Sequence, residues 1–121
     1  MLDNKDRRRV PRYKARVPCS VLCASTGSAL LTHTEGLSVN AISLTIPSNP
    51  TYGADPDNVG VNVELKLALP AGYVRLSGSL VRLEQANTID NLFVFKIEEA
   101  SEVDRRIYDE HLDSLSRAQI L

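Results

Sequence analysis

The sequence predicts a six-stranded antiparallel all-β domain with a basic N-terminal arm and one amphipathic helix at the C-terminal end. Three observations predict it. The 121 residues, 43% of them hydrophobic, suit one globular domain. Short runs rich in Val, Leu and Ile alternate with clusters of Gly, Pro, Asn and Ser, as is typical of antiparallel strands joined by turns. Apolar residues at helical spacing occur only near the C-terminal end.

The first sixteen residues differ in charge from the rest of the chain. They hold seven basic residues against two acids, a charge of +5, whereas the other 105 residues carry −6. This segment has few apolar side chains and no 3.6-residue period, so we expect an extended or loosely ordered arm, not a helix. The expected organisation is an arm over residues 1–16 and a single domain over residues 17–121. A polyanion would meet a basic arm on a mildly acidic body.

The first three strands are expected at residues 16–24, 29–37 and 41–47. Only Ser-Val-Asn, at residues 38–40, separates the second strand from the third, which predicts a tight connection. A long polar loop rich in Pro and Gly follows over residues 48–60.

The fourth strand shows strict alternation. Its apolar residues Val63, Leu65, Leu67 and Leu69 alternate with Asn62, Glu64 and Lys66, which predicts a strand with one face inward. A Pro-Ala-Gly turn precedes the fifth strand, at about residues 74–83. Because Leu83 falls out of phase with the inward residues before it, we expect a bulge at residues 78–81. The sixth strand is expected at residues 92–97.

The last element is a helix at about residues 101–116. Ser101 precedes acids in the first turn, which is the pattern of an N-cap. Apolar residues then recur three or four positions apart, which predicts a helix with one face packed on the β domain: Val103, Ile107, Tyr108, Leu112 and Leu115.

Several function classes are disfavoured by what the sequence lacks. No apolar run approaches the 18–20 residues of a membrane span, and the charged N-terminal end does not fit a signal peptide. No phosphate-binding loop, nucleophile elbow or metalloprotease motif occurs, so we expect no catalytic residues and no enzyme. Cys19 and Cys23, with His33 and His111, are too few for a zinc site, so we expect reduced thiols, structural or surface histidines and no metal.

The arginines of the arm are the candidate ligand-binding residues. Arg7, Arg8 and Arg9 are consecutive, and Arg12 follows Pro11. A guanidinium group binds a phosphate or the Hoogsteen edge of guanine through two parallel hydrogen bonds and also stacks on a base. In an extended chain Arg8 and Arg12 would lie about 13 Å apart, but a turn at Pro11 would let both reach one ligand. The alternative is a basic tail for solubility or nonspecific nucleic-acid contact.

The arm and a small-residue corner together resemble the binding signature of the PilZ family. That signature is Arg-x-x-x-Arg followed, after 20–30 residues, by Asp/Asn-x-Ser-x-x-Gly. Here Arg8 and Arg12 match the first half and Ser38 matches the serine, whereas Gly36 replaces the Asp/Asn and Ala41 replaces the final glycine. The six strands and the acidic start of the C-terminal helix also resemble this family.

The resemblance implies a six-stranded antiparallel barrel that binds cyclic di-GMP, with no other cofactor. Arg8 and Arg12 would hold its phosphates and guanine edges, and Ser38 would offer its hydroxyl. Arg7 implies a stacked pair of ligands, that is, two molecules per domain. Gly36 lacks the acceptor that an Asp or Asn would offer guanine, which would weaken binding by about one to two decades.

The corner would be reshaped at Ala41 if that position required a positive φ. On the same resemblance the ligand orders the arm, and an effector protein of motility, exopolysaccharide or adhesion machinery recognises the change in the bacterial cytoplasm. One alternative is a PilZ module that binds protein without ligand. Another is a small nucleic-acid-binding barrel, disfavoured because the chain has only two Phe and four Tyr and no aromatic platform; we therefore expect no nucleic acid among the partners.

Overall fold

The computed structural model describes residues 11–23, 27, 29–47, 60–85 and 90–118. These residues form seven strands and one helix, in the order β1 (Tyr13–Lys14), β2 (Pro18–Cys23), β3 (Ala29–Leu37), β4 (Ala41–Pro47), β5 (Asn62–Leu69), β6 (Gly72–Gln85), β7 (Asp90–Glu99) and α2 (Glu102–Ala118). All six predicted strands and the predicted helix are present. The long loop expected at residues 48–60 lies almost wholly outside the described residues.

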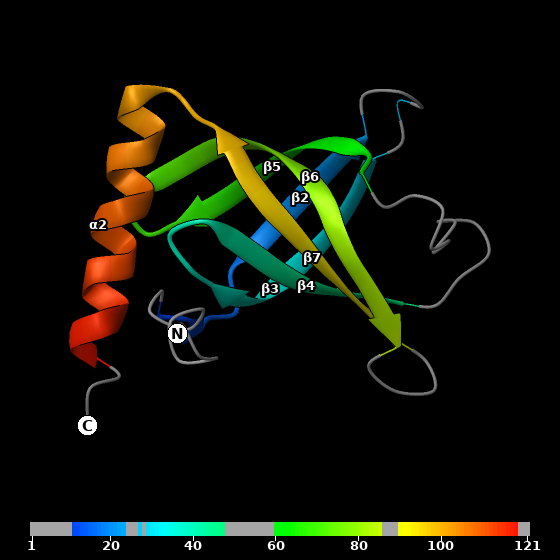
Figure 1. Cartoon of the computed structure of the whole chain (residues 1–121). Coiled ribbons are helices and arrows are strands. Elements are labelled where there is room, and N and C mark those ends of the chain that lie inside the picture. The colour runs from blue at the N-terminus through cyan, green and yellow to red at the C-terminus, as the bar shows by residue number, and fades with distance from the viewer. Residues whose placement is uncertain (1–10, 24–26, 28, 48–59, 86–89, 119–121) are drawn as a thin grey trace, which may run out of the picture.

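Six strands close into an antiparallel barrel with β1 added outside the ring (Figure 1). The neighbour order is β3, β2, β5, β6, β7, β4, and β4 pairs back with β3. The connection between β3 and β4 is the tight turn expected at residues 38–40. Closure matters for function because it brings β6, β7, β4 and β3 side by side, although β6 is far from β3 in the chain.

The barrel interior is filled by the inward faces of the strands. Alternate residues of β5, from Val63 to Leu69, are buried as the two-residue period predicts. The other fully buried side chains include Leu37, Ile42, Leu44, Val74, Leu76 and Leu80. Because neighbouring residues in a strand point to opposite faces, the residues between these core positions face outward. The outward residues of β3, β4, β7 and β6 therefore share one face of the sheet.

The expected irregularity in β6 is confirmed. The register of β6 against β7 shifts between Ser77 and Gly78 and again between Leu80 and Arg82. A Cβ at Gly78 would clash with the backbone carbonyl of Lys96, so the two strands approach too closely there for any side chain. The second shift skips Val81 and pairs Arg82 with Val94. A bulge of this kind changes the direction of the side chains that follow it.

The end of the basic arm is joined to the barrel by β1, which was not predicted. Tyr13 pairs with Leu37 and Lys14 with Gly36. Thr34, which is fully buried, holds the following residues by donating to the Ala15 carbonyl and accepting from the Val17 amide at 3.0 Å. Residues 11–16 thus run along β3, extended as expected, and place Arg12 beside the β3–β4 turn.

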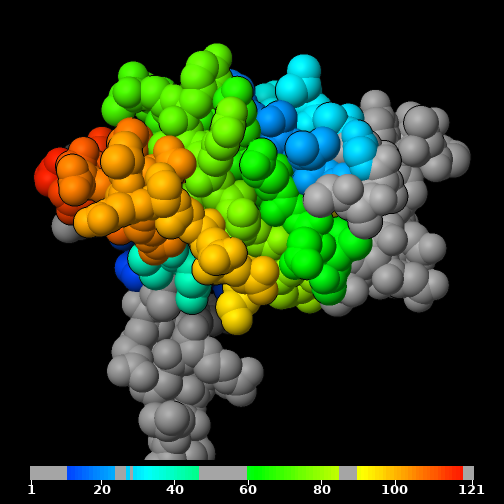
Figure 2. Space-filling model, turned by 90° about the horizontal axis from the view of Figure 1, so that it is seen from above, coloured from blue at the N-terminus to red at the C-terminus, as the bar shows by residue number. Residues whose placement is uncertain are grey.

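Helix α2 begins after Ser101, whose hydroxyl accepts from the Asp104 amide at 3.0 Å, the N-cap expected from the sequence. It packs against β6 and β1 beside the barrel (Figure 1). In the space-filling view the helix, orange to red, lies against the green strands, with the turquoise β3–β4 region at its edge (Figure 2). No helix among the described residues is long and apolar enough to cross a membrane. No disulfide joins Cys19 and Cys23, and burial raises the pKa of Cys19 to about 12, so its thiolate is disfavoured.

Candidate functional site

A pocket lies on the outer face of the barrel beside the β3–β4 turn. It is lined by residues from four strands, from the turn and from the segment just before β1: Arg12, Gly36, Leu37, Ser38, Ala41, Ser43, Arg82, Leu92 and Val94. The register explains how it forms. Gly36 pairs with Ser43, Ser43 with Val94, and Val94 with Arg82, so these residues make one row across β3, β4, β7 and β6. The small residues in this row leave the hollow, and the arginine stands at its end.

The turn beside the pocket is held by hydrogen bonds within residues 38–41. The Ser38 amide donates to the Ala41 carbonyl at 2.9 Å, and the Ala41 amide donates to the Ser38 hydroxyl at 3.0 Å. The hydroxyl hydrogen of Ser38 has two acceptors within reach, the Asn40 side-chain oxygen at 3.1 Å and the Ala41 carbonyl at 3.2 Å. Ser38 is only 3% exposed, so its hydroxyl group forms hydrogen bonds inside the turn and stabilises it.

Gly36 and Ala41, where the chain departs from the PilZ signature, both lie in ordinary strand backbone. Among the described residues no residue other than glycine has a positive φ, so the Ala41 position does not require one and alanine fits there without strain. A Cβ at Gly36 would lie 3.0 Å from the Ser43 hydroxyl oxygen and 3.7 Å from the Tyr13 carbonyl oxygen. A side chain at Gly36 would therefore enter the pocket.

Two arginines reach the pocket from opposite sides. Arg12, just before β1, is exposed and stands beside the turn. Arg82 comes from β6 on the far side, where its guanidinium forms an exposed ion pair with Glu84 at 2.9 Å. An exposed pair of this kind is weak, so Arg82 can exchange Glu84 for an anionic ligand at little cost. The pocket thus has cationic ends and a small, partly apolar floor.

The structure brings four of the six predicted ligand-binding residues to this pocket: Arg12, Gly36, Ser38 and Ala41. Arg7 and Arg8 lie outside the described residues. Sequence reasoning missed Arg82, Ser43, Leu92 and Val94, because strand pairings between distant segments bring them there. The one local signal was the predicted bulge at residues 78–81, which precedes Arg82.

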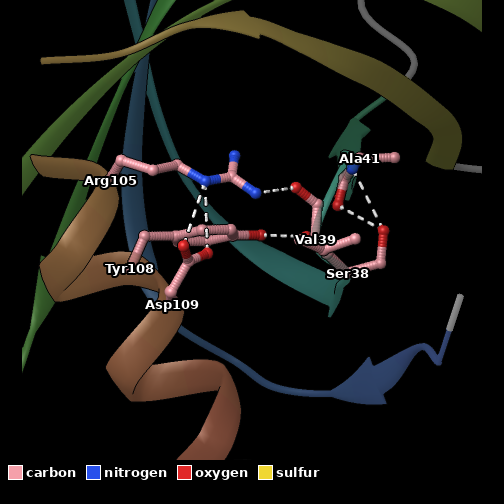
Figure 3. Close-up of polar contacts among 6 residues, drawn as sticks. All are labelled: Ser38, Val39, Ala41, Arg105, Tyr108 and Asp109. Atoms are coloured by element: carbon pink, nitrogen blue, oxygen red, sulfur yellow. Dashed lines mark hydrogen bonds and ion pairs between the residues drawn. The ribbon is translucent and has the colours of Figure 1, made fainter. Parts of the chain in front are cut away.

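Helix α2 also contacts the β3–β4 turn (Figure 3). The Tyr108 hydroxyl donates to the Ser38 carbonyl at 2.6 Å, and the Arg105 guanidinium donates to the Val39 carbonyl at 2.5 Å. Burial raises the pKa of Tyr108 well above its usual value, so the hydroxyl stays protonated and able to donate. The described residues include no group of three or more His, Cys, Asp or Glu that could hold a metal ion.

A family model of the PilZ domain matches residues 6–114, which is most of the chain. The chain belongs to the PilZ family. No curated protein sequence matches it. The PilZ assignment agrees with the closed six-stranded barrel, the additional strand and the C-terminal helix described above.

Solved structures share this PilZ fold. The Bacillus subtilis inhibitor of motility MotI/DgrA superposes with a TM-score of 0.72 at 14% identity, covering 99% of this chain, which spans 56% of the Bacillus chain. The PilZ domain of YcgR from Escherichia coli, solved with c-di-GMP, superposes with a TM-score of 0.70 at 16% identity, with 93% of each chain covered. The K. pneumonia MrkH–c-di-GMP complex superposes with a TM-score of 0.68 at 14% identity, with 89% of this chain and 52% of the MrkH chain covered.

Proposed function

We propose that this PilZ domain binds cyclic di-GMP in the pocket between Arg12 and Arg82. The observation that carries the proposal is the position of this pocket. It lies against the turn that holds Ser38, and Arg12, the second arginine of the Arg-x-x-x-Arg motif, lines it. The YcgR PilZ domain and MrkH, which share the fold, were solved with this ligand.

The chemistry of the pocket suits an anionic purine dinucleotide. Guanidinium groups bind phosphates and the O6/N7 edge of guanine with paired hydrogen bonds. Gly36 and Ser43 leave room for a flat ring on the strand surface, and Leu92 and Val94 offer an apolar wall to its face. Arg82 adds a cation that the family signature does not contain, which would offset part of the affinity lost through the missing acceptor at Gly36.

The proposal also includes a role for the basic arm and recognition of the bound state by a partner protein. Arg7 and Arg8 would join Arg12 at the ligand, and Arg7 would favour a stacked pair of ligand molecules. Residues 11–16 already lie along β3, and binding would order the rest of the segment 5–16 over the pocket and create a surface that an effector protein in the bacterial cytoplasm recognises. No metal and no second cofactor is required.

Calorimetric titration with cyclic di-GMP tests this function. We expect heat of binding for the natural protein and a loss of about a hundredfold or more in affinity for the Arg8→Ala/Arg12→Ala double variant, because each charge-assisted pair contributes about 1.5–3 kcal/mol. The matched control is Arg75→Ala/Arg117→Ala, which removes two exposed arginines that do not line the pocket.

Three outcomes would contradict the proposal. One is the absence of heat at tens of micromolar protein, and another is undiminished binding by the Arg8→Ala/Arg12→Ala variant. If the protein binds an effector equally well with and without nucleotide, it is a ligand-independent interaction module. Salt-sensitive binding to single-stranded oligonucleotides would instead indicate a nucleic-acid-binding barrel.

A further inference from the structure

The β3–β4 turn is shared between the proposed nucleotide pocket and helix α2. Ser38 and Ala41 bond to each other and line the pocket. The carbonyl groups of Ser38 and Val39 accept hydrogen bonds from Tyr108 and Arg105 of α2 (Figure 3). Ser38 therefore belongs both to the pocket lining and to the contact with the helix.

The Tyr108 contact is rigid. Its side chain is fully buried, so both the ring and the hydroxyl are fixed by packing. The hydrogen bond to the Ser38 carbonyl is 2.6 Å long and lies in the interior, where it is not exchanged for water. Any shift of the Ser38 carbonyl away from Tyr108 must break this bond or move the helix.

Arg105 makes a second contact to the same turn and is itself held in place. Its guanidinium forms an ion pair with Asp109 one helical turn later at 3.2 Å and lies over the Tyr108 ring, 5.7 Å from its centre. The backbone carbonyl of Asn40, the next residue of the turn, accepts a hydrogen bond from the Ile97 amide at 2.9 Å. Three consecutive carbonyl groups, at residues 38 to 40, are thus all bonded to the body of the protein.

We propose that Tyr108 is a positioning residue for the nucleotide pocket and that α2, through Tyr108 and Arg105, responds when the pocket is occupied. This inference rests on the proposed function for its ligand. A bound nucleotide fixes the Ser38–Ala41 turn, and the fixed turn strengthens the two bonds to the helix. By reciprocity, a partner that stabilises the docked helix raises the affinity for nucleotide.

A buried tyrosine needs an acceptor wherever it lies, so the Tyr108 bond alone would fit a purely structural role. Arg105 provides the second observation. Its long side chain reaches from the helix surface to the carbonyl next to the one that Tyr108 contacts, although its partner Asp109 was already available on the helix. Two side chains of one helix thus converge on adjacent peptide groups of the turn.

The decisive experiment combines titration with amide hydrogen exchange in Tyr108→Phe, which keeps the ring and removes the hydroxyl. Without ligand, we expect the amides of Ser38, Ala41 and Ile97 to exchange faster than in the natural protein. We expect affinity for cyclic di-GMP to fall about three- to tenfold. The matched control is Tyr73→Phe, which removes the hydroxyl of an exposed tyrosine outside the pocket and should change neither quantity.

The same measurements in Arg105→Gln separate an effect on the turn from one on the helix. Its control is Arg117→Gln, because Arg117 also forms an ion pair within the helix, with Asp113 four residues earlier. We expect ligand to slow exchange in α2 of the natural protein and of Arg117→Gln. In Arg105→Gln and Tyr108→Phe this slowing should shrink by half or more.

The outcomes distinguish the two proposals. If the natural protein binds no cyclic di-GMP, the proposed function fails, and the ligand-free exchange rates of Tyr108→Phe still decide whether the helix holds the turn. If the natural protein binds but Tyr108→Phe matches it in affinity and in exchange, Tyr108 is structural only and the inference fails. Ligand that protects the turn but leaves exchange in α2 unchanged overturns the coupling to the helix.

Discussion

The two sides of the pocket are built in opposite ways. In the β3–β4 turn Ser38 is buried, although Val39 and Asn40 are exposed, and the peptide groups of the turn bond to one another, to β7 and to α2. The two arginines at the ends are exposed, and the guanidinium of Arg82 forms a surface ion pair with Glu84. The turn therefore determines the shape of the pocket, whereas the arginines supply charge. Changes in the turn should lower stability and binding together, and changes in the arginines should lower binding alone.

Among the single substitutions, the largest expected effect is at Arg82. Arg82→Gln should weaken cyclic di-GMP binding about ten- to a hundredfold, because it removes a charge-assisted hydrogen bond of about 1.5–3 kcal/mol. The urea midpoint should stay unchanged, since the ion pair with Glu84 is exposed. Arg75→Gln, on the same strand but outside the pocket, is the control. Unchanged affinity in Arg82→Gln would remove this arginine from the site.

Next comes the turn itself. Ser38→Ala removes the acceptor of the Ala41 amide and should lower the free energy of unfolding by about 1–2 kcal/mol. Binding should weaken in parallel. Urea denaturation and titration measure the two effects. Ser79→Ala, which loses only an exposed contact to Glu98, should stay within about 0.5 kcal/mol of the natural protein. Lost binding with full stability would show that the Ser38 hydroxyl contacts ligand directly.

A gain of function is expected at Gly36. Gly36→Asn would add an acceptor for guanine and should raise affinity about tenfold. The added Cβ lies 3.0 Å from the Ser43 hydroxyl oxygen, the end of a short side chain that can rotate away. Gly36→Ala adds the Cβ without the amide and should not raise affinity. Equal affinities of Gly36→Asn and Gly36→Ala for cyclic di-GMP would show that position 36 does not face the base.

The smallest effect concerns pH and lies away from both regions. Burial lowers the pKa of His111 below its usual value of about 6.5, and its Nε2 is buried without a hydrogen-bond partner among the described residues. The unfolded chain therefore takes up a proton before the folded one does. Stability should be full above about pH 6.5 and fall as the pH drops below it, and His111→Gln should reduce this slope. Chemical denaturation at several pH values measures the slope of the unfolding free energy against pH. Equal slopes for the natural protein and His111→Gln would show that His111 does not cause the pH dependence.

Much of the barrel could be predicted because its signals are local. Alternation in β5 and the phase change before Leu83 follow from adjacent residues, and both were confirmed. The strand ends were less accurate. Strand β7 extends from Asp90 to Glu99 instead of 92–97, since backbone pairing continues into polar residues that show no apolar pattern. Strand β1 has two residues and no pattern of its own, and it exists because β3 offers an edge there.

The site was predictable only in part. Arg12 and Ser38 could be identified from a spaced motif, but Arg82 could not, since only the register of β6, β7, β4 and β3 places it there. The hydrogen bond of Tyr108 could not be predicted from the sequence either. Its spacing predicted a buried helix face, which it occupies, yet nothing local indicates that its hydroxyl reaches the Ser38 carbonyl.

The bond between Tyr108 and Ser38 joins residues 70 positions apart, and that between Arg105 and Val39 joins residues 66 positions apart. During synthesis, the turn thus emerges from the ribosome long before the helix that holds it. Ordering of the turn must wait until the strands have paired and α2 has been made, since long-range contacts form only after the loop between them has closed. A nascent barrel without α2 would present the pocket residues while lacking their support, so competence to bind nucleotide should arise only after α2 has been made.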